Sequence, residues 1–311
     1  MPCSLPPAER ADPMTEGSAV ADLLERCSFP PPGTAVVCGV SGGADSLALL
    51  LLAVATGCEV TAVHVDHGLR EGSAEEAEIV RSVAADLGAG FRAERVEVGH
   101  GPNLEARARA ARHRVLGPSA ALGHTADDQA ETILLNLLRG AGLDGLAGMR
   151  PGRRHPILRL RRRETEGLCL SRGLTPVRDP TNDDPAFLRN RVRHEALPLL
   201  EDLAGRDLVA VVTRQADLLR EASDHLRREA TVLDPTDVAV LRAAAPVLAR
   251  VAIREWLRSL DSDGHPPDAA AVERVLSVVR GEVRATEVPG GRRVARTAGR
   301  LRLEEPDPVV P

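Results

Sequence analysis

Lysine and tyrosine are absent from the 311 residues of this sequence, and aromatic residues make up only 1% of it. All 40 basic residues are therefore arginine. A Walker A phosphate loop is excluded, because that motif needs a lysine before its serine or threonine. Since aromatic side chains are so few, leucine, valine and alanine must build the core, and little stacking on splayed nucleic-acid bases is available.

The cysteines and the apolar segments limit the class of protein further. Neither metal-binding nor redox spacing relates the five cysteines, which are Cys3, Cys27, Cys38, Cys58 and Cys169. Their odd number and scatter favour a reducing compartment and argue against a zinc or iron–sulfur site held by cysteine. No apolar run reaches membrane-spanning length, and no signal peptide is visible. We expect a cytoplasmic protein with no membrane partner.

The chain is long enough for two domains. Residues 1–17 are proline-rich and polar, so we expect a disordered N-terminal extension. Residues 18–205 alternate strands with helices, which predicts an α/β domain with a doubly wound, Rossmann-like parallel sheet. Its strands are expected at 35–40, 59–65, 91–98 and 119–123, with a fifth starting at 155. The sequence pattern of residues 206–311 predicts a smaller, mainly helical domain with a hairpin turn at 289–291. This part of the chain contains no recognisable chemical motif.

The most informative stretch is a glycine turn between the first strand and an apolar helix. It consists of Ser41, Gly42, Gly43, Ala44, Asp45 and Ser46. The glycines allow a tight bend, and the N–H groups of the turn and of the first helical turn can then bind an anion such as phosphate. Asp45 is unusual beside an anion, and it suits a magnesium ion that accompanies the phosphates. The simpler interpretation is that Ser41 or Asp45 only caps the helix.

A second polar cluster follows the short strand at 119–123. His124 precedes an apolar helix in which Asp128 and Glu131 share one face. Two aligned carboxylates can bind an ammonium group or a magnesium ion, and a neutral histidine can take a proton from an amine. A capping box formed by Thr125 and Asp128 is the simpler alternative.

Basic residues gather in two places. Arg109 and Arg112 share a face of a predicted helix, and seven arginines with no acidic residue lie between residues 150 and 163. A solvated surface is the usual meaning of such a run, but beside a nucleotide site it indicates a groove for the phosphates of a polyanion. His64, near the carboxyl end of the second strand, is a further site candidate because ligands of open α/β sheets bind there.

The turn at 41–46 resembles the PP-loop of the ATP-pyrophosphatase superfamily, whose members split ATP into AMP and pyrophosphate. Further segments resemble the tRNA(Ile)-lysidine synthetase family in its short form, and these are 63–70, 105–112, 124–132 with the Arg139-Gly140 loop, 179–182 and 189–193. The resemblance runs in order from residue 35 to residue 200, and the likeness of the C-terminal part is weak.

This resemblance implies an ATP-dependent carbon–nitrogen ligase. ATP would adenylate the C2 oxygen of the wobble cytidine in the CAU anticodon of an isoleucine tRNA. The ε-amine of free lysine would then attack C2, and AMP would leave. The product pairs with A rather than G, which changes codon reading from AUG to AUA. ATP and Mg²⁺ are the implied cofactors, and this tRNA and free L-lysine are the implied partners, while the existence of a homodimer stays open.

The resemblance also implies roles for individual residues. The nucleotide would be bound by Ser41, Gly42, Gly43, Ala44, Asp45, Ser46, His64, Arg109 and Arg112, with Asp45 as the metal ligand. The catalytic residues would be Asp45, Arg112, His124, Asp128 and Glu131, and the last two would also bind lysine. The tRNA would contact Arg139, Arg159, Arg161, Arg162, Arg189, Asn190 and Arg193.

Three other functions fit the sequence less well. A tRNA thiolase of the same superfamily would need catalytic or cluster-binding cysteines, and the spacing here is wrong. An amide-forming ligase related to NAD synthetase is a closer alternative, which residues 124–132 do not favour. A nucleotide-binding sensor without turnover is the third, and the Asp128–Glu131 pair argues against it. Departures from the family pattern are His113 in place of Tyr, His155 in place of Arg, and Arg178 in place of Glu.

Overall fold

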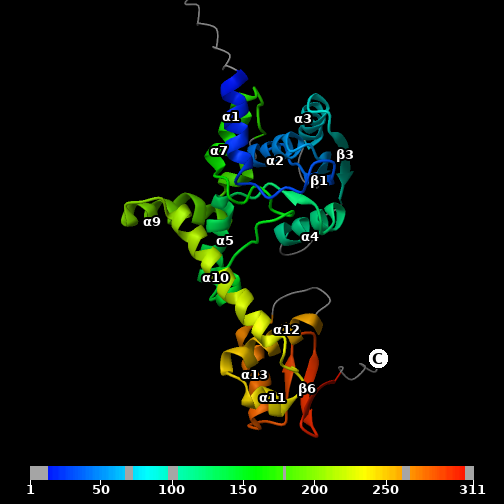
Figure 1. Cartoon of the computed structure of the whole chain (residues 1–311), viewed down its shortest axis with the longest axis vertical. Helices are drawn as coiled ribbons and strands as arrows, with labels where there is room; N and C mark the ends of the chain where they lie inside the picture. Colours follow the sequence, from blue (N-terminus) through cyan, green and yellow to red (C-terminus); the bar gives the residue numbers. More distant parts are fainter. Residues whose placement is uncertain (1–12, 67–72, 97–103, 178–179, 261–266, 305–311) are drawn as a thin grey trace, which may run out of the picture. The chain divides into compact units, whose positions relative to one another are not determined.

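The computed structural model describes residues 13–66, 73–96, 104–177, 180–260 and 267–304 (Figure 1). The chain divides into two compact units, Met1–Ala216 and Asp217–Pro311. The boundary between the units falls within helix α10 (Leu208–Ala230). Each unit has a hydrophobic core of its own.

The first unit is built on a parallel sheet whose strand order is β3-β2-β1-β4. Its strands are β1 (Ala35–Gly39), β2 (Glu59–Asp66), β3 (Gly90–Arg95) and β4 (Ala121–Leu122). The chain builds outward from β1 to β3 and then crosses back, so that β4 pairs with the free side of β1. The strand order therefore reverses between β1 and β4. Ligands of open α/β sheets bind at such a point, outside the carboxyl ends of the strands.

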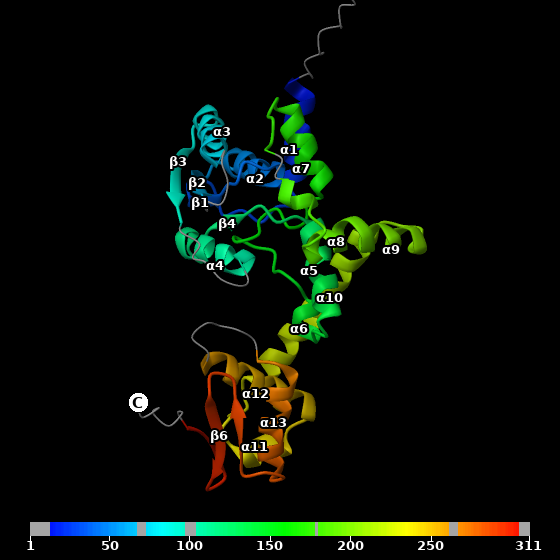
Figure 2. The same ribbon diagram turned by 180° about the vertical axis from the view of Figure 1, so that it is seen from behind.

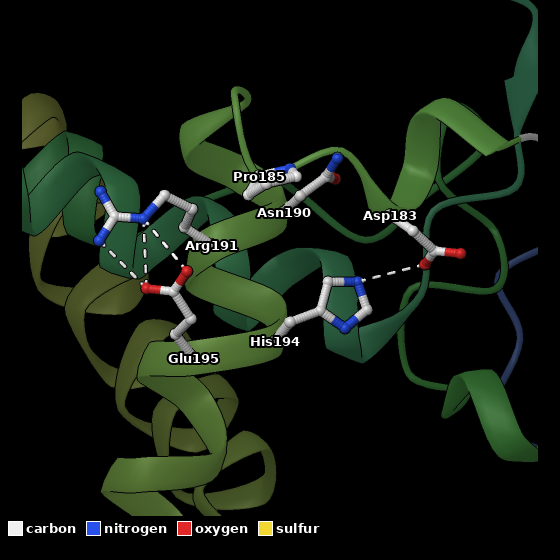
Figure 3. Close-up of a pocket in the computed structure, with 6 residues that line it drawn as sticks. All are labelled: Asp183, Pro185, Asn190, Arg191, His194 and Glu195. Atoms are coloured by element: carbon white, nitrogen blue, oxygen red, sulfur yellow. Dashed lines mark hydrogen bonds and ion pairs between the residues drawn. The ribbon is translucent and has the colours of Figure 1, made fainter.

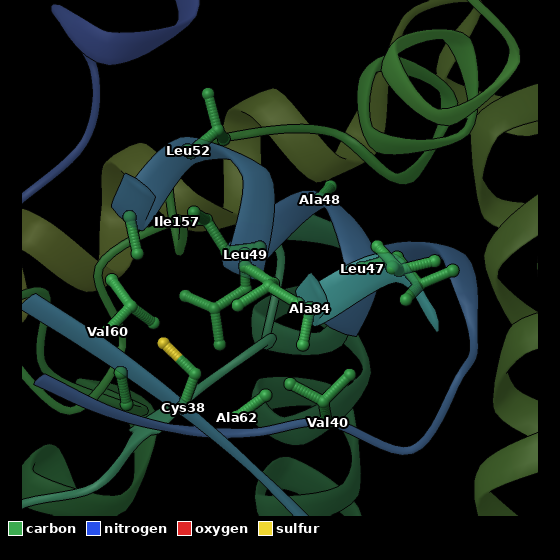
Figure 4. Packing of buried hydrophobic residues seen from close by; sticks show 14 of the residues in the cluster. Cys38, Val40, Leu47, Ala48, Leu49, Leu52, Val60, Ala62, Ala84 and Ile157 are labelled. Carbon is green, nitrogen blue, oxygen red and sulfur yellow. The ribbon is translucent and has the colours of Figure 1, made fainter. Parts of the chain in front are cut away.

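Helices cover both faces of this sheet (Figure 2). Helices α2 (Ala44–Ala55) and α3 (Ser73–Asp86) pack on one face, and α4 (Leu104–Leu116) packs on the other. Because successive strand residues point to opposite faces, neighbouring positions of β2 enter different cores. Figure 4 shows the first core, with Cys38, Val60, Ala62, Leu49 and Ala84 among its buried residues. The second core contains Val63, Leu116 and Leu122. The doubly wound sheet expected from the sequence is confirmed.

Further helices follow the sheet in the chain. They are α5 (Ala126–Leu138), α6 (Leu143–Leu146), α7 (Arg162–Ser171), the 3-10 turn η1 (Pro180–Asp183), α8 (Leu188–Arg191), the π-helical turn η2 (Val192–Ala196) and α9 (Leu197–Ala204). Helix α7 packs beside α2, where Leu168 and Cys169 join the first core. Helix α5 packs against η2, α9 and the first part of α10 through Ile133, Leu197 and Val212.

Helix α1 (Pro13–Leu24) begins earlier than expected. The helix includes residues 13–17, the last part of the extension expected from the sequence. Proline suits the first turn of a helix, because an N–H at that position would have no helical partner. The end of this region is tied to α7 by an ion pair of 2.6 Å between Arg26 and Glu164. The rest of the expected extension, residues 1–12, lies outside the described residues.

The fifth strand expected from residue 155 is wrong. In the described part of the chain the parallel sheet ends at β4, and residues 152–160 form turns. This segment does run beside β4, since the carbonyl of Arg154 accepts a hydrogen bond from the N–H of Leu122 at 2.8 Å. Pro156 has no N–H with which to continue a ladder. The apolar pattern that indicated a strand instead reflects buried turn residues, which are Ile157, Leu158 and Leu160.

The second unit combines helices with a small antiparallel sheet of order β5-β6-β7. Its elements are α11 (Val238–Ala243), α12 (Pro246–Leu260), α13 (Ala269–Arg280), β5 (Ala285–Val288), β6 (Arg292–Thr297) and β7 (Arg300–Glu304). The turn expected at 289–291 is confirmed, and both of its glycines have positive φ. The next turn places Ala298 at φ 49°, an uncommon value for a residue with a side chain.

Among the described residues, no helix is both long enough and apolar enough to cross a lipid bilayer. The cysteines that the structure describes, Cys27, Cys38, Cys58 and Cys169, are free thiols. Burial raises the pKa of Cys38 to about 12, so this thiol stays protonated and acts as a small apolar core residue. The remaining cysteine, Cys3, lies outside the described residues.

Candidate active site

The loop between β1 and α2 is held in shape by its own serines. The Oγ of Ser46 donates to the carbonyl of Gly43 at 2.8 Å and accepts from the N–H of Ser41 at 3.1 Å. The two serine Oγ atoms are 3.3 Å apart, and Ser41 is the donor because the hydrogen of Ser46 is already used. Gly42 has a φ of +90°, where glycine is strongly preferred. These contacts close a tight turn at the start of α2.

The amide groups of this turn form an anion site. Gly43 is the N-cap of α2, so the N–H groups of Ala44 and Asp45 have no partner within the helix. In the part of the chain that the structure describes, no acceptor is bonded to the N–H of Gly42 or Gly43. The positive end of the helix dipole lies behind these groups and favours negative charge. The geometry therefore suits the phosphate-binding role predicted for residues 41–46.

His64 lies at the base of this turn. Its side chain is buried, and Nδ1 donates to the carbonyl of Val40 at 3.0 Å. Since a carbonyl can only accept, a neutral ring carries its proton on Nδ1 and leaves Nε2 as an acceptor. His64 thus holds Val40, which follows β1 and immediately precedes the predicted nucleotide loop.

The end of β4 passes directly against the start of α2. A Cβ on Gly123 would lie 2.8 Å from the carbonyl oxygen of Asp45, which is closer than real Cβ contacts allow. Only glycine permits this approach of the two backbones. Because His124 and α5 follow at once, the polar cluster after β4 is brought to the same edge of the sheet as the glycine turn after β1.

Two carboxylates of α5 are surrounded by arginines. Glu131 is completely buried, and Asp128 is 9% exposed. Glu131 accepts hydrogen bonds from Arg193 Nε at 2.6 Å, from Arg189 Nε at 2.8 Å and from Arg162 Nη2 at 3.3 Å. Asp128 Oδ1 accepts from Arg162 Nη2 at 3.1 Å and from Arg189 Nη2 at 3.4 Å. The predicted amine-binding pair is therefore in contact with three guanidinium groups.

The second oxygen of Asp128 caps the helix. Oδ2 accepts from the N–H of Thr125 at 2.8 Å and from its hydroxyl at 3.0 Å. The capping interpretation is thus correct for this oxygen. It does not account for Oδ1 or for Glu131, which lies one turn further along α5 and pairs only with arginines in the described structure.

Arg162 connects the acidic pair to the glycine turn. Its Nε lies 3.5 Å from Asp45 Oδ2, while its Nη2 binds Asp128 and Glu131. Thr165, one turn further along α7, donates to the other oxygen of Asp45. Burial, and then the charge of Asp128, raises the pKa of Asp45 to about 6 despite these donors. No sequence motif singles out Thr165, because its place beside Asp45 depends on the packing of α7 against α2.

Arg161 makes a separate set of ion pairs. It donates two hydrogen bonds of 3.1 Å to Asp127 and also pairs with Asp207. Burial raises the pKa of Asp127, but the hydrogen bonds from Arg161 and from the backbone of Arg162 lower it overall. Four of the arginines predicted to contact tRNA are thus paired with carboxylates inside the unit, and these are Arg161, Arg162, Arg189 and Arg193.

The other residues predicted at the tRNA differ in their surroundings. Arg139 and Arg159 are exposed, and no carboxylate of the described residues pairs with either. Asn190 is buried, and its Nδ2 donates to the carbonyls of Thr181 and Asp184 at 2.8 and 2.9 Å. The amide of Asn190 therefore fixes the η1 turn, whereas the two exposed arginines are accessible to a large ligand.

His124 lies against a second histidine. Its Nδ1 is 3.1 Å from Nδ1 of His155, and the ring centroids are 4.9 Å apart in an edge-on arrangement. Two nitrogens at this distance share one hydrogen, so one ring donates and the other accepts. The turn segment beside β4 places His155 there. His155, which stands where the family pattern has Arg, is thus in direct contact with His124, the histidine predicted to be catalytic.

Asp45 is the predicted metal ligand, and Arg109 and Arg112 are predicted to bind the nucleotide. Within the described ranges, no three His, Cys, Asp or Glu side chains are grouped so that they could hold a metal ion by themselves. Asp45 nevertheless suits Mg²⁺, which commonly binds one or two carboxylates together with phosphate oxygens and water. Arg112 is half-buried on α4, and the side chain of Arg109 lies outside the described residues.

A pocket of about 250 Å³ lies between the η1 turn, the end of α8 and the π-helical turn η2 (Figure 3). It is lined by Asp183, Pro185, Asn190, Arg191, His194 and Glu195. Arg191 pairs with Glu195 at 3.0 Å, and His194 lies 3.6 Å from Asp183. Both pairs are largely exposed. It lacks the buried carboxylates that distinguish the site at Asp45, Asp128 and Glu131.

A family model described as a PP-loop domain matches residues 18–200. Among solved structures, a U34-tRNA thiolase from Methanococcus maripaludis has a similar fold, with a TM-score of 0.54 and 16% identity over 67% of this chain and 81% of that chain. The parallel sheet, the glycine turn at 41–46 and the matching family model define this unit as a PP-loop domain, in agreement with the predicted fold.

Two curated proteins named tRNA(Ile)-lysidine synthase are similar along most of their length. The one from Nocardia farcinica is 41% identical over 298 residues, which cover 88% of this chain and 93% of that protein. The one from Salinispora tropica is 41% identical over 318 residues, which cover 91% and 94%. The chain belongs to the tRNA(Ile)-lysidine synthase family, whose members are ATP-dependent ligases. The family resemblance inferred from the sequence motifs is confirmed.

Proposed function

We propose that this chain ligates free L-lysine to C2 of the wobble cytidine in the CAU anticodon of an isoleucine tRNA. The C2 oxygen of the cytidine first attacks the α-phosphorus of ATP, and pyrophosphate leaves. The ε-nitrogen of lysine then attacks C2, the bond from C2 to oxygen breaks, AMP leaves with that oxygen, and the nitrogen loses a proton. One observation carries the proposal: Arg162 reaches Asp45 with one nitrogen and Asp128 and Glu131 with another, so both predicted half-sites lie within one side chain of each other.

The glycine turn would hold the nucleotide. Its N–H groups and the hydroxyl of Ser41 would bind the phosphates that leave as pyrophosphate. With a pKa of about 6, Asp45 is mostly ionised at neutral pH, as a metal ligand must be. A bound Mg²⁺ would neutralise charge on the phosphates. The end of β4 touches the start of α2 at Gly123, so the adenylated base would lie close to the polar cluster after β4.

Asp128 and Glu131 would position lysine. Ammonium groups favour buried carboxylates, and this pair already binds cations, in the form of arginine side chains. The ε-amine of free lysine is protonated near pH 7, so it must lose a proton before it can attack. His124 would accept that proton, since it immediately precedes the helix that carries Asp128 and Glu131.

The tRNA would be bound through arginine and backbone groups. Arg139 and Arg159 are exposed cations of the first unit, and phosphate contacts from such residues make binding dependent on salt. The second unit, Asp217–Pro311, would extend the RNA-binding surface. Free tRNA and free lysine meet in the cytoplasm, which is where we place the protein.

The direct test supplies the purified protein with ATP, magnesium, radiolabelled lysine and a CAU-anticodon tRNA, and measures label in RNA. Label should appear only when all components are present. Asp45→Ala should abolish AMP formation, whereas Asp86→Ala, at an exposed position of α3, should leave the rate unchanged. Absence of label in RNA, or normal AMP formation by Asp45→Ala, would contradict the proposal. AMP formation that needs ammonia or glutamine and no tRNA would favour an NAD-synthetase-like ligase.

The role of the acidic pair has its own test. Glu131→Gln should raise the apparent KM for lysine more than the apparent KM for ATP, because the substitution removes the charge that attracts the amine. Steady-state rates at varied lysine and varied ATP measure both constants. Equal changes in the two constants would show that Glu131 does not act on lysine.

A further inference from the structure

Arg162 has a different set of partners from every other arginine around the acidic pair. Arg189 and Arg193 pair only with carboxylates of α5, and Arg161 pairs with Asp127 and Asp207. Of the side chains that the structure describes, Arg162 alone is bonded both to the glycine turn, through Asp45, and to Asp128 and Glu131. Its guanidinium therefore lies between the place predicted for phosphate and the place predicted for lysine.

Each carboxylate around Arg162 is paired with at least one guanidinium. The carboxylates of Asp45, Asp127, Asp128 and Glu131 face the guanidiniums of Arg161, Arg162, Arg189 and Arg193. An arriving ammonium group would add a positive charge to this mostly buried cluster, and it would find every carboxylate already paired. Lysine can bind there only after a guanidinium has moved away.

A bound nucleotide provides a reason for that movement. Phosphates on the N–H groups of the glycine turn would bring several negative charges close to Asp45, within reach of Arg162. Guanidinium binds phosphate through two parallel hydrogen bonds, which are stronger than single contacts. The backbone N–H of Arg162 donates to Asp127 at 2.8 Å, so the main chain stays anchored while the side chain changes partners.

We infer that Arg162 exchanges its carboxylate partners for nucleotide phosphate, and that this exchange opens the acidic pair to lysine. The inference rests on the proposed function and adds to it an order of binding and a residue that enforces it. Without nucleotide, Arg162 blocks the lysine position. With nucleotide, Arg162 neutralises phosphate and leaves Asp128 and Glu131 with unpaired negative charge. Binding of the two ligands is then positively coupled, and by linkage each ligand strengthens the other by the same factor.

Calorimetric titration measures this coupling directly. The dissociation constant of lysine is determined with and without a non-hydrolysable ATP analogue plus magnesium, in the wild-type chain and in Arg162→Ala. We expect nucleotide to tighten lysine binding at least about tenfold in the wild type, equivalent to about 1.4 kcal/mol. In Arg162→Ala the ratio should fall to within about twofold, because lysine binds more tightly without nucleotide and the analogue binds more weakly.

Two further variants complete the experiment. Arg163→Ala is the matched control, since the neighbouring arginine is exposed, and it should keep the full coupling. Arg162→Lys keeps a cation and tests the geometry if the alanine variant is unstable. An ammonium is a single point of charge that cannot contact Asp45 and Glu131 at once, so coupling should again fall at least about threefold.

The results separate this inference from the proposed function. Unchanged coupling in Arg162→Ala and Arg162→Lys, or a wild-type chain that binds both ligands independently, would overturn the exchange. Nucleotide binding without any lysine binding in either state would also overturn it. The label-transfer assay into RNA uses the wild-type chain and tests the proposed function by itself, so it can still succeed when the coupling between nucleotide and lysine is absent.

Discussion

Substitution of Glu131 tests how much its buried carboxylate stabilises the first unit through the arginines around it. Its side chain is completely buried, and its oxygens accept hydrogen bonds from Arg162, Arg189 and Arg193. Glu131→Gln keeps the size of the side chain but leaves one positive charge without a counter-charge. Removing one member of a buried ion pair costs about 3–5 kcal/mol. Because glutamine keeps one acceptor oxygen, we expect a loss of about 3 kcal/mol in the unfolding free energy of the first unit.

Urea unfolding followed by far-ultraviolet circular dichroism measures this loss. With an m-value of about 2 kcal/mol/M, a loss of about 3 kcal/mol lowers the midpoint by about 1.5 M. Trp256 is the one tryptophan of the sequence and packs against the core of the second unit. Its fluorescence therefore follows the unfolding of the second unit, and this transition should keep its midpoint in the variant.

Glu195→Gln is the matched control. Glu195 pairs with Arg191 one helical turn away at 3.0 Å, but its side chain is 56% exposed. Exposed pairs of this kind contribute about 0–1 kcal/mol. If Glu131→Gln destabilised the chain no more than Glu195→Gln, the buried cluster would not be the stabilising feature described above.

Three further predictions concern separate parts of the molecule. Asp45 has a pKa raised to about 6 from the ordinary 3.8, so protonation favours folding; this contribution is complete below pH 3.8 and is lost as the pH rises through about 6. Asp45→Asn should therefore be more stable than the wild type by about 1–3 kcal/mol at pH 7.5 but no more stable near pH 4. Thermal unfolding of both proteins at the two pH values measures this, and a stability difference between them that did not change with pH would contradict the prediction. Ala298→Gly should stabilise the second unit by about 1 kcal/mol, because Ala298 has a φ of 49°; an unchanged midpoint of Trp256 fluorescence would refute it. Arg139→Ala and Arg159→Ala should each weaken tRNA binding and reduce the salt slope by about 1, as filter binding at several salt concentrations would show; an unaltered slope would place the phosphate contacts elsewhere.

Local sequence patterns were sufficient to predict the parallel sheet and the glycine turn. A β-branched apolar run, two glycines and a leucine-rich helix follow one another within residues 35–55, and each element depends mostly on its own residues. The segment from residue 155 failed as a strand for a non-local reason. Its apolar residues are buried beneath α2, but Pro156 and the surrounding turns prevent ladder pairing with β4.

The sequence by itself determined the family and the candidate residues of the site, namely the turn at 41–46 and the polar residues at the start of α5. Only the tertiary structure decided what the arginines do. Arg162, Arg189 and Arg193 reach Glu131 from positions 31, 58 and 62 residues along the chain. A run of like charges looks like a solvated or RNA-binding surface until its counter-charges are known, and those are supplied by another helix. Ion pairing depends on distance in space, which a one-dimensional pattern does not contain.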